Sequence, residues 1–510
     1  MRPPPPAAPA TPSWRGGVCV FAPLAVAALA LAGCAHHDYA RYEPRPIDPA
    51  KTAAAFETHR LDDPGLRKFL RENFRADFPL TGTPEGGWDF EALCWVAFYF
   101  NPTLDVARAQ WESARAAQTT AGERPNPTLT LTPGFSANPN GASPWLPAIG
   151  ADFTIETAGK RDLRAEAARL TAESARQEVF AAAWRVRSEL RSALLDIVLA
   201  TRRHAALDAV LQPQQNILAL LEQRRAAGAG TAAESAATRL AILKAEIAAA
   251  DAARQIPLAR QRVASALGMP AIVLSGIDMP VPRNAIEALR WAVPLFDGVG
   301  EGLPDRYRVD EARRQSLHSR ADVLAALARY AAAESALAVE IAKQHPDIHL
   351  GPGYQWDQGQ NKWTLGVTLE LPILNHNEGA IAEATARRRE AAAQFNLVQA
   401  QVLAEIDGAV AAITAAGEQA VGVRRAEAEL ASQRALVESR LKAGGASQLD
   451  LQAARLEIIT NNQVGGEAAA QIALAAGQLE DALQIPLAHL EVLAPPERAA
   501  PAKPVSKKSP

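Results

Sequence analysis

The chain of 510 residues is poor in aromatic residues, in cysteine and in surplus charge, and each shortage excludes a class of protein. Aromatic residues make up 5% of the sequence, although hydrophobic residues make up 48%. A large core filled by aromatic rings is therefore excluded, and closely packed, alanine-rich helices are favoured. With a net charge of -3, the chain lacks the surplus of basic residues that is typical of nucleic-acid-binding proteins, so we expect no nucleic-acid partner.

Residues 1–33 have the features of a bacterial signal peptide. Positive charge comes first, and the apolar run that follows, residues 18–32, is too short to span a membrane comfortably. The run ends in LAGC, which resembles the lipobox of bacterial lipoproteins, whose cysteine is acylated and becomes the mature N-terminus. The resemblance makes Cys34 the expected lipidation site and, because Ala35 replaces the aspartate of retained lipoproteins, implies the outer membrane. The alternative is an ordinary secretory signal with a chance cysteine.

Cysteine occurs only three times in the sequence. Cys19 would be lost with the signal peptide and Cys34 would be acylated, which leaves Cys94 as the single thiol of the mature chain. An intramolecular disulfide is therefore excluded. We expect Cys94 to be a buried apolar residue.

Most of the chain from residue 101 to residue 486 is a duplicated unit. PNPTLTLTPGF, from Pro125, matches the stretch that contains HPDIHLGPGY, from His345, at an offset of 219 positions. EQRRAAGAGTAAESAATRLAI, from Glu222, aligns with ESRLKAGGASQLDLQAARLEI, from Glu438, at an offset of 216. Each unit reads as helix, strand, loop, strand, long helix, glycine turn and long helix.

The duplication sets the expected domain bounds. The parts are a signal peptide (1–33), an N-terminal anchor and equatorial segment (34–100), a first repeat (101–270), an inter-repeat linker and equatorial segment (271–319), a second repeat (320–486) and a disordered tail (487–510). Within the repeats we expect strand hairpins over residues 127–157 and 346–372 and helical hairpins over residues 160–267 and 379–484.

The helical hairpins are expected to be very long. A continuous helix over residues 160–227 would reach on the order of 100 Å at roughly 1.5 Å per residue. We expect Pro213 and Pro257 to kink or divide the helices of the first hairpin. The chain reverses at two turns that offer glycines for left-handed backbone and a hydroxyl residue to cap the returning helix: Gly228, Gly230, Thr231, Gly444, Gly445 and Ser447.

Four strands are predicted, near residues 127–136, 149–157, 346–357 and 362–372. Alternation predicts one apolar face with Leu129, Leu131, Phe153 and Ile155, and another with Leu365, Val367, Leu369 and Leu371. A strand of about ten residues tilted by about 45° rises roughly 23 Å, which fits the apolar band of an outer-membrane barrel. The residues expected in its aromatic girdle are Tyr354, Trp356 and Trp363.

A soluble sheet would explain the same alternation equally well. In a membrane, however, four strands do not close into a barrel, and lipid does not tolerate an open edge. The membrane interpretation therefore predicts that several copies of the chain share one barrel.

These features together resemble the outer membrane efflux proteins of the TolC family. The resemblance covers nearly all of the mature chain and depends on its architecture: the duplicated unit, the strand hairpins, the lipobox and the glycine turns. It implies a mainly α fold with a membrane β-barrel portion. In that fold a homotrimer shares a twelve-stranded outer-membrane barrel, to which each protomer gives four strands, and an α-helical periplasmic tunnel continues it.

The resemblance also implies a function without an enzymatic step. The chain would be a passive exit duct, supplied by an inner-membrane pump and a periplasmic membrane-fusion adaptor. ETAGKRDLRAEAAR, from Glu156, resembles the branch that serves heavy-metal pumps, so heavy-metal cations are the expected cargo. Drug or general small-molecule efflux is the alternative, and a periplasmic lipoprotein adaptor or scaffold is a further one.

The periplasmic end of the expected tunnel supplies the remaining candidate residues. Acidic side chains narrow this end in the family, and matching by position puts Asp450 there, whereas Ala453 stands where a second acid is common. The spacing of Asp450 from Ser447 equally predicts a carboxylate that stabilises a helix N-terminus. By the resemblance, the two hairpin tips with Leu449 would contact the adaptor.

No cofactor and no metal site are expected. His345 and His349 lie four residues apart, which on a strand separates them by about 13 Å, too far to share one ion. His36 and His37 are more simply explained by a solvated linker. The sequence shows no nucleophile or phosphate motif of a lipid-anchored enzyme.

Overall fold

The computed structural model describes residues 42–73, 90–137, 143–274 and 309–486. The predicted signal peptide, Cys34, His36, His37, the middle of the inter-repeat linker and the predicted tail lie outside the described residues. The chain divides into two compact units, Met1–Ala55 and Phe56–Pro510, and α2 (Pro49–Glu57) is the helix at their boundary. The arrangement below is that of the second unit.

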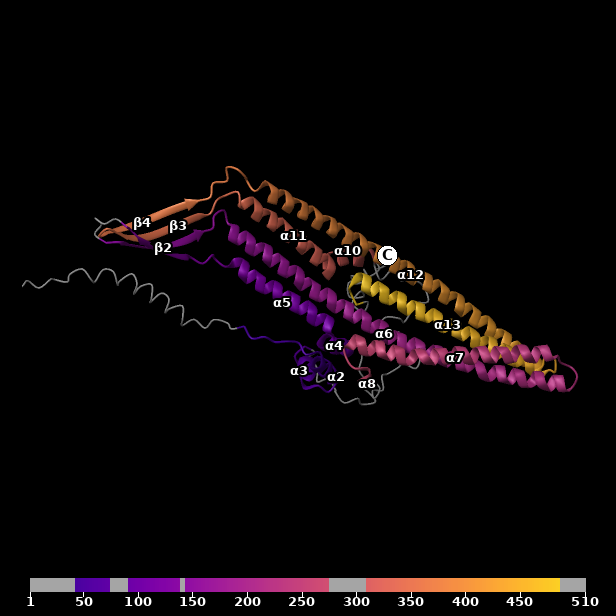
Figure 1. The fold of residues 1–510 in the computed structure, drawn as a ribbon. Coiled ribbons are helices and arrows are strands. Elements are labelled where there is room, and N and C mark those ends of the chain that lie inside the picture. The colour runs from indigo at the N-terminus through magenta and orange to yellow at the C-terminus, as the bar shows by residue number, and fades with distance from the viewer. Residues whose placement is uncertain (1–41, 74–89, 138–142, 275–308, 487–510) are drawn as a thin grey trace, which may run out of the picture. The chain divides into compact units, whose positions relative to one another are not determined.

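Two successive sets of helices and strands make up this unit (Figure 1). The first set contains α3 (Pro64–Asn73), α4 (Phe90–Phe100), α5 (Pro102–Gly122), β1 (Thr128–Phe135), β2 (Trp145–Ile155), α6 (Lys160–Ala226), α7 (Ala232–Leu267) and α8 (Ala271–Leu274). The second contains α10 (Val309–Ser319), α11 (Ala321–Ala342), β3 (Ile348–Asp357), β4 (Gln360–Leu369), α12 (Glu378–Lys442) and α13 (Gln448–Leu483). The predicted order of helix, two strands and two long helices is confirmed in both halves.

The long helices continue through the prolines of the first hairpin. Pro213 lies inside the 67 residues of α6, and Pro257 lies inside the 36 residues of α7. Of the two expected outcomes, a kink or a division, division of the helices is therefore wrong. A proline removes only one backbone hydrogen bond, and the packing of α6 against α7 stabilises both helices around that loss.

The main core lies where the short helices meet the long ones. Residues of α4 form one buried cluster with residues of α6 and α7, and a second cluster joins α12 to α13. Cys94 of α4 is buried in the first cluster, as predicted, and burial raises the pKa of its thiol to about 12. The thiol is therefore protonated and unreactive at neutral pH.

In both halves, a side chain that precedes a short helix donates a hydrogen bond to a carbonyl near the end of a long return helix. The Asn101 side-chain amide donates to the carbonyl of Ala266 (2.9 Å), and the Arg320 guanidinium donates to the carbonyl of Ala482 (2.5 Å). Ala266 and Ala482 are related by the offset of 216 found in the sequence. The duplication therefore extends from the sequence to the polar contacts that position the helices.

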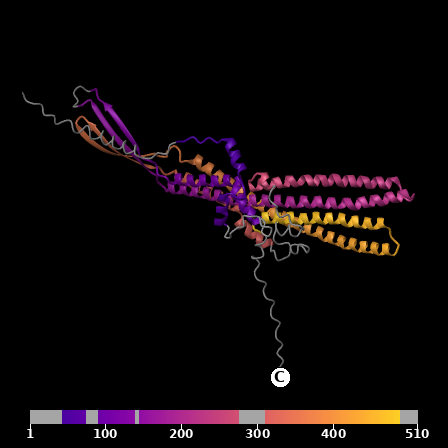
Figure 2. The same ribbon diagram turned by 90° about the horizontal axis from the view of Figure 1, so that it is seen from below.

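The two long helices differ in how much of their surface is covered. α6 packs against α5, α7, α11 and α13, whereas α12 packs mainly against α11 and α13. Fourteen residues of α6 are buried, but only seven residues of α12 are. Among the described helices, α12 is the one that is long and apolar enough to cross a membrane by length and composition, and only 22% of that apolar stretch is buried. Figure 2 shows the hairpin of α6 and α7 beside the hairpin of α12 and α13.

Candidate channel wall, junction and hairpin tips

The strands form one antiparallel sheet in the order β1-β2-β3-β4. Its register aligns one residue from each strand in rows, such as Leu131, Ile149, Tyr354 and Trp363. The two strand hairpins thus join through β2 and β3, although the halves are far apart in sequence. Within the described residues, β1 and β4 each pair on one side only, so the sheet has two open edges.

One face of the sheet is apolar and exposed. Because paired residues point to the same side, the register places both sets of predicted apolar residues on a single face rather than on two. Between 44% and 79% of the surface of these large side chains is exposed: Leu129, Leu131, Phe135, Trp145, Phe153, Ile155, Trp363, Leu365, Val367 and Leu369. An exposed apolar face of this size marks a surface that contacts a membrane or another protein.

The opposite face carries mostly polar or small residues. Its members include Thr128, Thr130, Thr132, Gly150, Asp152, Thr154, His349, Gly353, Gln355, Lys362, Thr364 and Thr368. Apolar residues that face lipid alternate with polar residues that face a lumen in outer-membrane barrels. The sheet therefore has the two-sided pattern of a barrel wall.

His349 in β3 and His345 just before β3 have separate hydrogen-bond partners. The His349 ring nitrogen Nδ1 lies 3.0 Å from an Asp152 carboxylate oxygen and 3.3 Å from the Thr154 hydroxyl. His345 instead precedes β3 and offers its carbonyl to Lys160 at 2.5 Å. Over the described residues, no group of three or more His, Cys, Asp or Glu side chains is arranged to hold a metal ion.

Aromatic residues gather at the end of the sheet that is farther from the helices. Phe135 packs edge-on against Trp145, with ring centroids 5.5 Å apart, and Tyr354 packs against Trp363 at 4.9 Å. All four lie on the apolar face, one on each strand, and Trp356 of β3 shares that face. Phe135 and Trp145 were absent from the residues predicted for an aromatic girdle, and the girdle itself stays a prediction. Their positions on either side of a turn rich in Gly, Pro and Asn were the signal for them.

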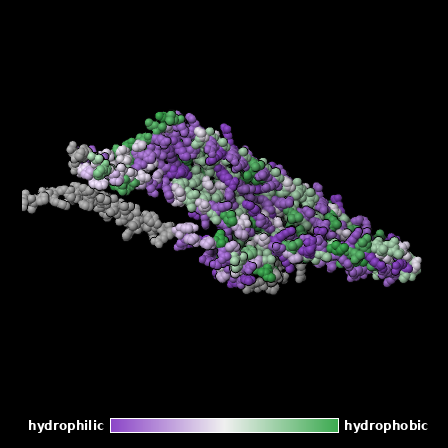
Figure 3. Space-filling model, in the orientation of Figure 1, coloured by the Kyte–Doolittle hydropathy of each residue, from purple (hydrophilic) through white to green (hydrophobic). Residues whose placement is uncertain are grey.

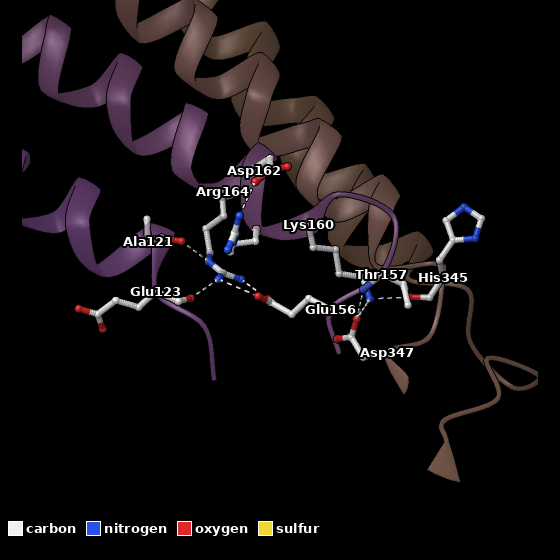
Figure 4. A network of polar contacts seen from close by, with 10 residues as sticks. Ala121, Glu123, Glu156, Thr157, Lys160, Asp162, Arg164, His345 and Asp347 are labelled. Carbon is white, nitrogen blue, oxygen red and sulfur yellow. Dashed lines mark hydrogen bonds and ion pairs between the residues drawn. The ribbon is translucent and has the colours of Figure 1, made fainter. Parts of the chain in front are cut away.

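Where β2 leads into α6, a buried lysine joins the two strand hairpins (Figure 4). Gly159 adopts the left-handed backbone conformation (φ 70°), and Lys160 then begins α6. The Lys160 ammonium, 7% exposed as a residue, lies 2.7 Å from the Asp347 carboxylate. The same carboxylate accepts the backbone N–H of Thr157 at 2.9 Å.

An arginine one turn further along α6 binds the preceding helix and strand. The Arg164 guanidinium pairs with the Glu156 carboxylate at 2.6 Å and donates to the carbonyls of Ala121 (2.9 Å) and Glu123 (3.3 Å). The end of α5, the end of β2 and the start of α6 therefore meet at one side chain (Figure 4). Lys160 and Arg164 thus build the junction between the sheet and the helices, whereas Arg161, the arginine of the Gly-Lys-Arg stretch, pairs with exposed Asp162.

The two hairpin tips have the same geometry. Gly228 (φ 75°) and Gly444 (φ 77°) adopt left-handed backbone at equivalent positions, which glycine permits without a steric cost. Thr231 and Ser447 then cap α7 and α13, and both caps are reciprocal pairs with the acidic residue three positions on. The structure places Gly230 and Gly445 in these turns, beside the caps.

Asp450 is the acidic partner in the second of these caps. Its carboxylate accepts the Ser447 backbone N–H at 2.7 Å, while its own N–H donates to the Ser447 hydroxyl at 3.2 Å. These bonds from Ser447, with the nearby charges of Arg440 and Arg224, lower the pKa of Asp450. The exposed carboxylate thus stabilises a helix start, and its role in a gate stays a prediction. Leu449 beside it is half-buried, and its contact with an adaptor likewise stays a prediction.

Comparison with known proteins assigns this arrangement to a family. The sequence model described as "Outer membrane efflux protein" matches residues 99–269 and 312–483. The cobalt-zinc-cadmium resistance protein CzcC of Cupriavidus metallidurans is 24% identical over 328 residues, which cover 62% of this chain and 72% of CzcC.

Solved structures share the fold. The outer membrane protein VceC of Vibrio cholerae superposes with a TM-score of 0.61 at 21% identity, over 77% of this chain and 95% of VceC. The open state of the MtrE outer membrane channel of Neisseria gonorrhoeae gives a TM-score of 0.62 at 18% identity, over 78% of this chain and 90% of MtrE. The two family matches fall on the two halves that share one order of helices and strands, and the chain belongs to the outer membrane efflux protein family.

Proposed function

We propose that the chain is the outer-membrane exit duct of a tripartite efflux pump and works as a homotrimer. The observation that carries the proposal is the sheet, which has an exposed apolar face, a polar face and two open edges in one chain. Its four strands are too few to close, so copies of the chain complete the barrel by pairing β4 of one with β1 of the next. Substrates pass through passively, with no enzymatic step.

The helices support the same assembly. α6 packs against its own return helix, α7, and against α13, the return helix of the other repeat. Among the described residues, α12 packs against its own return helix, α13, but makes no comparable contact with α7, and it has half as many buried residues as α6. In a ring, the α7 of a neighbouring copy would take the place beside α12 that α13 takes beside α6. The helices would then continue the barrel as a periplasmic tunnel. Acylated Cys34 would anchor each chain in the outer membrane. A membrane-fusion adaptor would contact the hairpin tips and connect the tunnel to an inner-membrane pump.

Heavy-metal cations are the cargo that we propose. The relative CzcC carries the name of a cobalt, zinc and cadmium resistance protein. In a homotrimer, the exposed carboxylates of Asp450 would form a ring of negative charge at the tunnel end, and such a ring favours cations. Drug or general small-molecule efflux is the alternative cargo.

Growth of a deletion strain tests the cargo. The strain is compared with and without the intact gene on a panel of divalent metals, monovalent copper and silver, and common drugs. Sensitivity confined to metals and rescued by the gene is expected. Sensitivity to drugs alone would overturn the metal assignment and leave the duct architecture intact.

The Asp450 ring has a matched control in the other hairpin. Glu234 occupies the same place in the cap of α7 that Asp450 occupies in the cap of α13. In planar bilayers, Asp450→Asn is expected to lower the preference for cations over anions, and Glu234→Gln is expected to leave it unchanged. Equal effects of the two variants would contradict a gate role that is specific to Asp450.

A further inference from the structure

The apolar face of the sheet continues beyond the last strand. After β4 ends at Leu369, the chain bends through Leu371, Ile373 and Leu374 before α12 begins. These three side chains are 67%, 75% and 97% exposed. Figure 3 shows a strongly hydrophobic patch where this bend lies, between the sheet and the start of α12. We call residues 371–374 the apolar bend.

The apolar bend has no counterpart in the first repeat. Four positions separate the end of β2 from the left-handed residue before α6, Gly159, whereas eight separate the end of β4 from the corresponding left-handed residue, Asn377. The shorter connection carries the polar contacts of Thr157 and Lys160. The second repeat therefore places an apolar insertion where the first places a polar junction.

Hydrogen bonds restrain the backbone of the apolar bend. The Ile373 N–H donates to the Leu371 carbonyl at 2.8 Å around Pro372, the pattern of an inverse γ-turn, for which the proline φ is suited. Beyond it, the Asn377 side chain donates to the carbonyl of Glu340 at 2.8 Å and to its carboxylate at 3.0 Å. A restrained backbone thus presents three exposed aliphatic side chains, and removing such side chains from water is favourable.

The spacing of Leu371 indicates which surface covers the start of the apolar bend. Leu371 follows Leu365, Val367 and Leu369 at the same two-residue spacing, so it continues the apolar face of the sheet. A second copy of the chain would instead join β4 along its free edge, through the backbone and in the plane of the sheet. The surface that lies against the apolar face therefore extends over Leu371, where the apolar bend begins.

The apolar bend lies at the opposite end of the sheet from the aromatic residues. The pairs Phe135–Trp145 and Tyr354–Trp363 lie beside the strand turns, whereas the bend lies beside the helices. Polar residues flank it on both sides, with Glu370 before it and Asn375 to Glu378 after it. An aliphatic segment between polar flanks is the pattern of a segment that rests in a membrane interface.

We propose that the apolar bend inserts into the periplasmic leaflet of the outer membrane and anchors the sheet there. The inference depends on the proposed function, because it requires the apolar face of the sheet to face lipid. Each copy of the chain contributes one such anchor, next to the edge strand β4. The ligand is the acyl chain of a phospholipid, close to its headgroup.

Fluorescence quenching by lipids tests this placement in the full chain. Leu374→Cys is labelled with a bimane fluorophore and reconstituted in phosphatidylethanolamine and phosphatidylglycerol vesicles that contain lipids with a nitroxide near the headgroup or at the chain end. Leu365→Cys reports on the sheet face, and Leu436→Cys, 60% exposed near the far end of α12, is the matched control. The unsubstituted chain measures background labelling, which burial of Cys94 keeps low.

We expect the nitroxide near the headgroup to quench the label at residue 374 several-fold more strongly than the label at residue 436. Quenching at residue 365 without quenching at residue 374 would overturn the anchor and leave the barrel wall standing. A label at residue 374 that is shielded from water but unquenched would also overturn it, in favour of a protein partner. Quenching at neither residue 365 nor residue 374 would overturn the membrane placement of the sheet and the anchor with it.

Discussion

The two repeats are alike at their hairpin tips and differ where the sheet meets the long helices. At the tips, left-handed glycines and reciprocal caps recur at an offset of 216 positions. At the junctions, the first repeat has a polar network around Lys160, and the second has the exposed apolar bend. Duplicated units thus keep what a helical hairpin needs to fold and diverge where the chain meets other surfaces.

The largest expected effect comes from a buried ion-pair cluster in which α6 of the first repeat contacts α13 of the second. Glu480 of α13, 1% exposed, accepts from Arg187 at 2.5 Å and from Arg191 at 3.0 Å. Glu480→Ala removes the carboxylate that both arginines share, so that Arg187 loses its carboxylate partner and Arg191 keeps only Asp481. Breaking a buried pair of this kind costs about 3–5 kcal/mol. Thermal unfolding of the detergent-solubilised chain, followed by circular dichroism, measures the loss. Glu467→Ala, on an exposed position of α13, is the control, and an equal effect would show that the buried pair does not join the repeats.

A second comparison uses equivalent residues after α7 and α13. Gly268 (φ 70°) and Gln484 (φ 50°) are both left-handed, but a Cβ at residue 268 would lie within 3.0 Å of the Phe100 carbonyl. Gly268→Ala is expected to cost about 1–2 kcal/mol for the backbone and about 1–3 kcal/mol for the overlap. Gln484→Ala loses one bond, to the Ala321 N–H at 3.0 Å, at about 1 kcal/mol. The same melting experiment measures both, and equal shifts would contradict the difference.

The polar junction is the third target. Lys160→Met removes the charged partner of Asp347 and a donor to the His345 carbonyl, and is expected to cost about 1.5–3 kcal/mol. Arg161→Met, at the next position and paired only with exposed Asp162, is the control. Both variants are followed by thermal unfolding. A smaller loss in Lys160→Met than in the control would rule out a stabilising role for the lysine.

The junction also predicts a dependence on pH. Burial raises the pKa of Asp347, but the bonds from Lys160 and from the Thr157 N–H outweigh it, so the pKa is lowered overall. A carboxylate with a lowered pKa contributes stability above its unfolded pKa of about 3.9, and this contribution is lost as the pH falls through the folded value. The acid-induced loss of stability is expected to be smaller in Lys160→Met than in the unsubstituted chain.

The hairpin tips are expected to give the smallest effect and an equal one. Thr231→Ala and Ser447→Ala each remove a helix cap, at about 1 kcal/mol. Unfolding measurements on both variants test whether the tips are energetically alike. A loss several-fold larger at one tip would show that this tip has a stabilising contact beyond its cap.

Local chemistry made much of this fold predictable. The repeat offset, the glycine turns and the caps follow from short stretches of sequence, and the structure has them where the sequence predicts them. β2 begins at Trp145, four residues before the predicted start at residue 149. The added stretch contains Pro147, and proline is normally confined to strand edges and ends. The structure pairs Pro147 with Pro133 across β1 and β2, where neither proline breaks the sheet.

The pairing register between strands of different repeats could not be predicted from the sequence. The single apolar face depends on the pairing of Ile149 with Tyr354, which joins two hairpins that no local signal connects. The aromatic pair Phe135–Trp145 and the partners of Lys160 depend on similar pairings. Division of α6, one of the two outcomes expected at Pro213, was wrong for a related reason, because the packing of α7 beside it is a tertiary effect.

The central claim is that open sheet edges of several copies close one shared barrel. The most direct test is native mass spectrometry of the full chain extracted from outer membranes in detergent. The account predicts a complex of three identical chains that withstands mild activation. A folded, inserted chain that is found only as a monomer would contradict it, because four strands alone leave the edges of β1 and β4 unpaired in lipid.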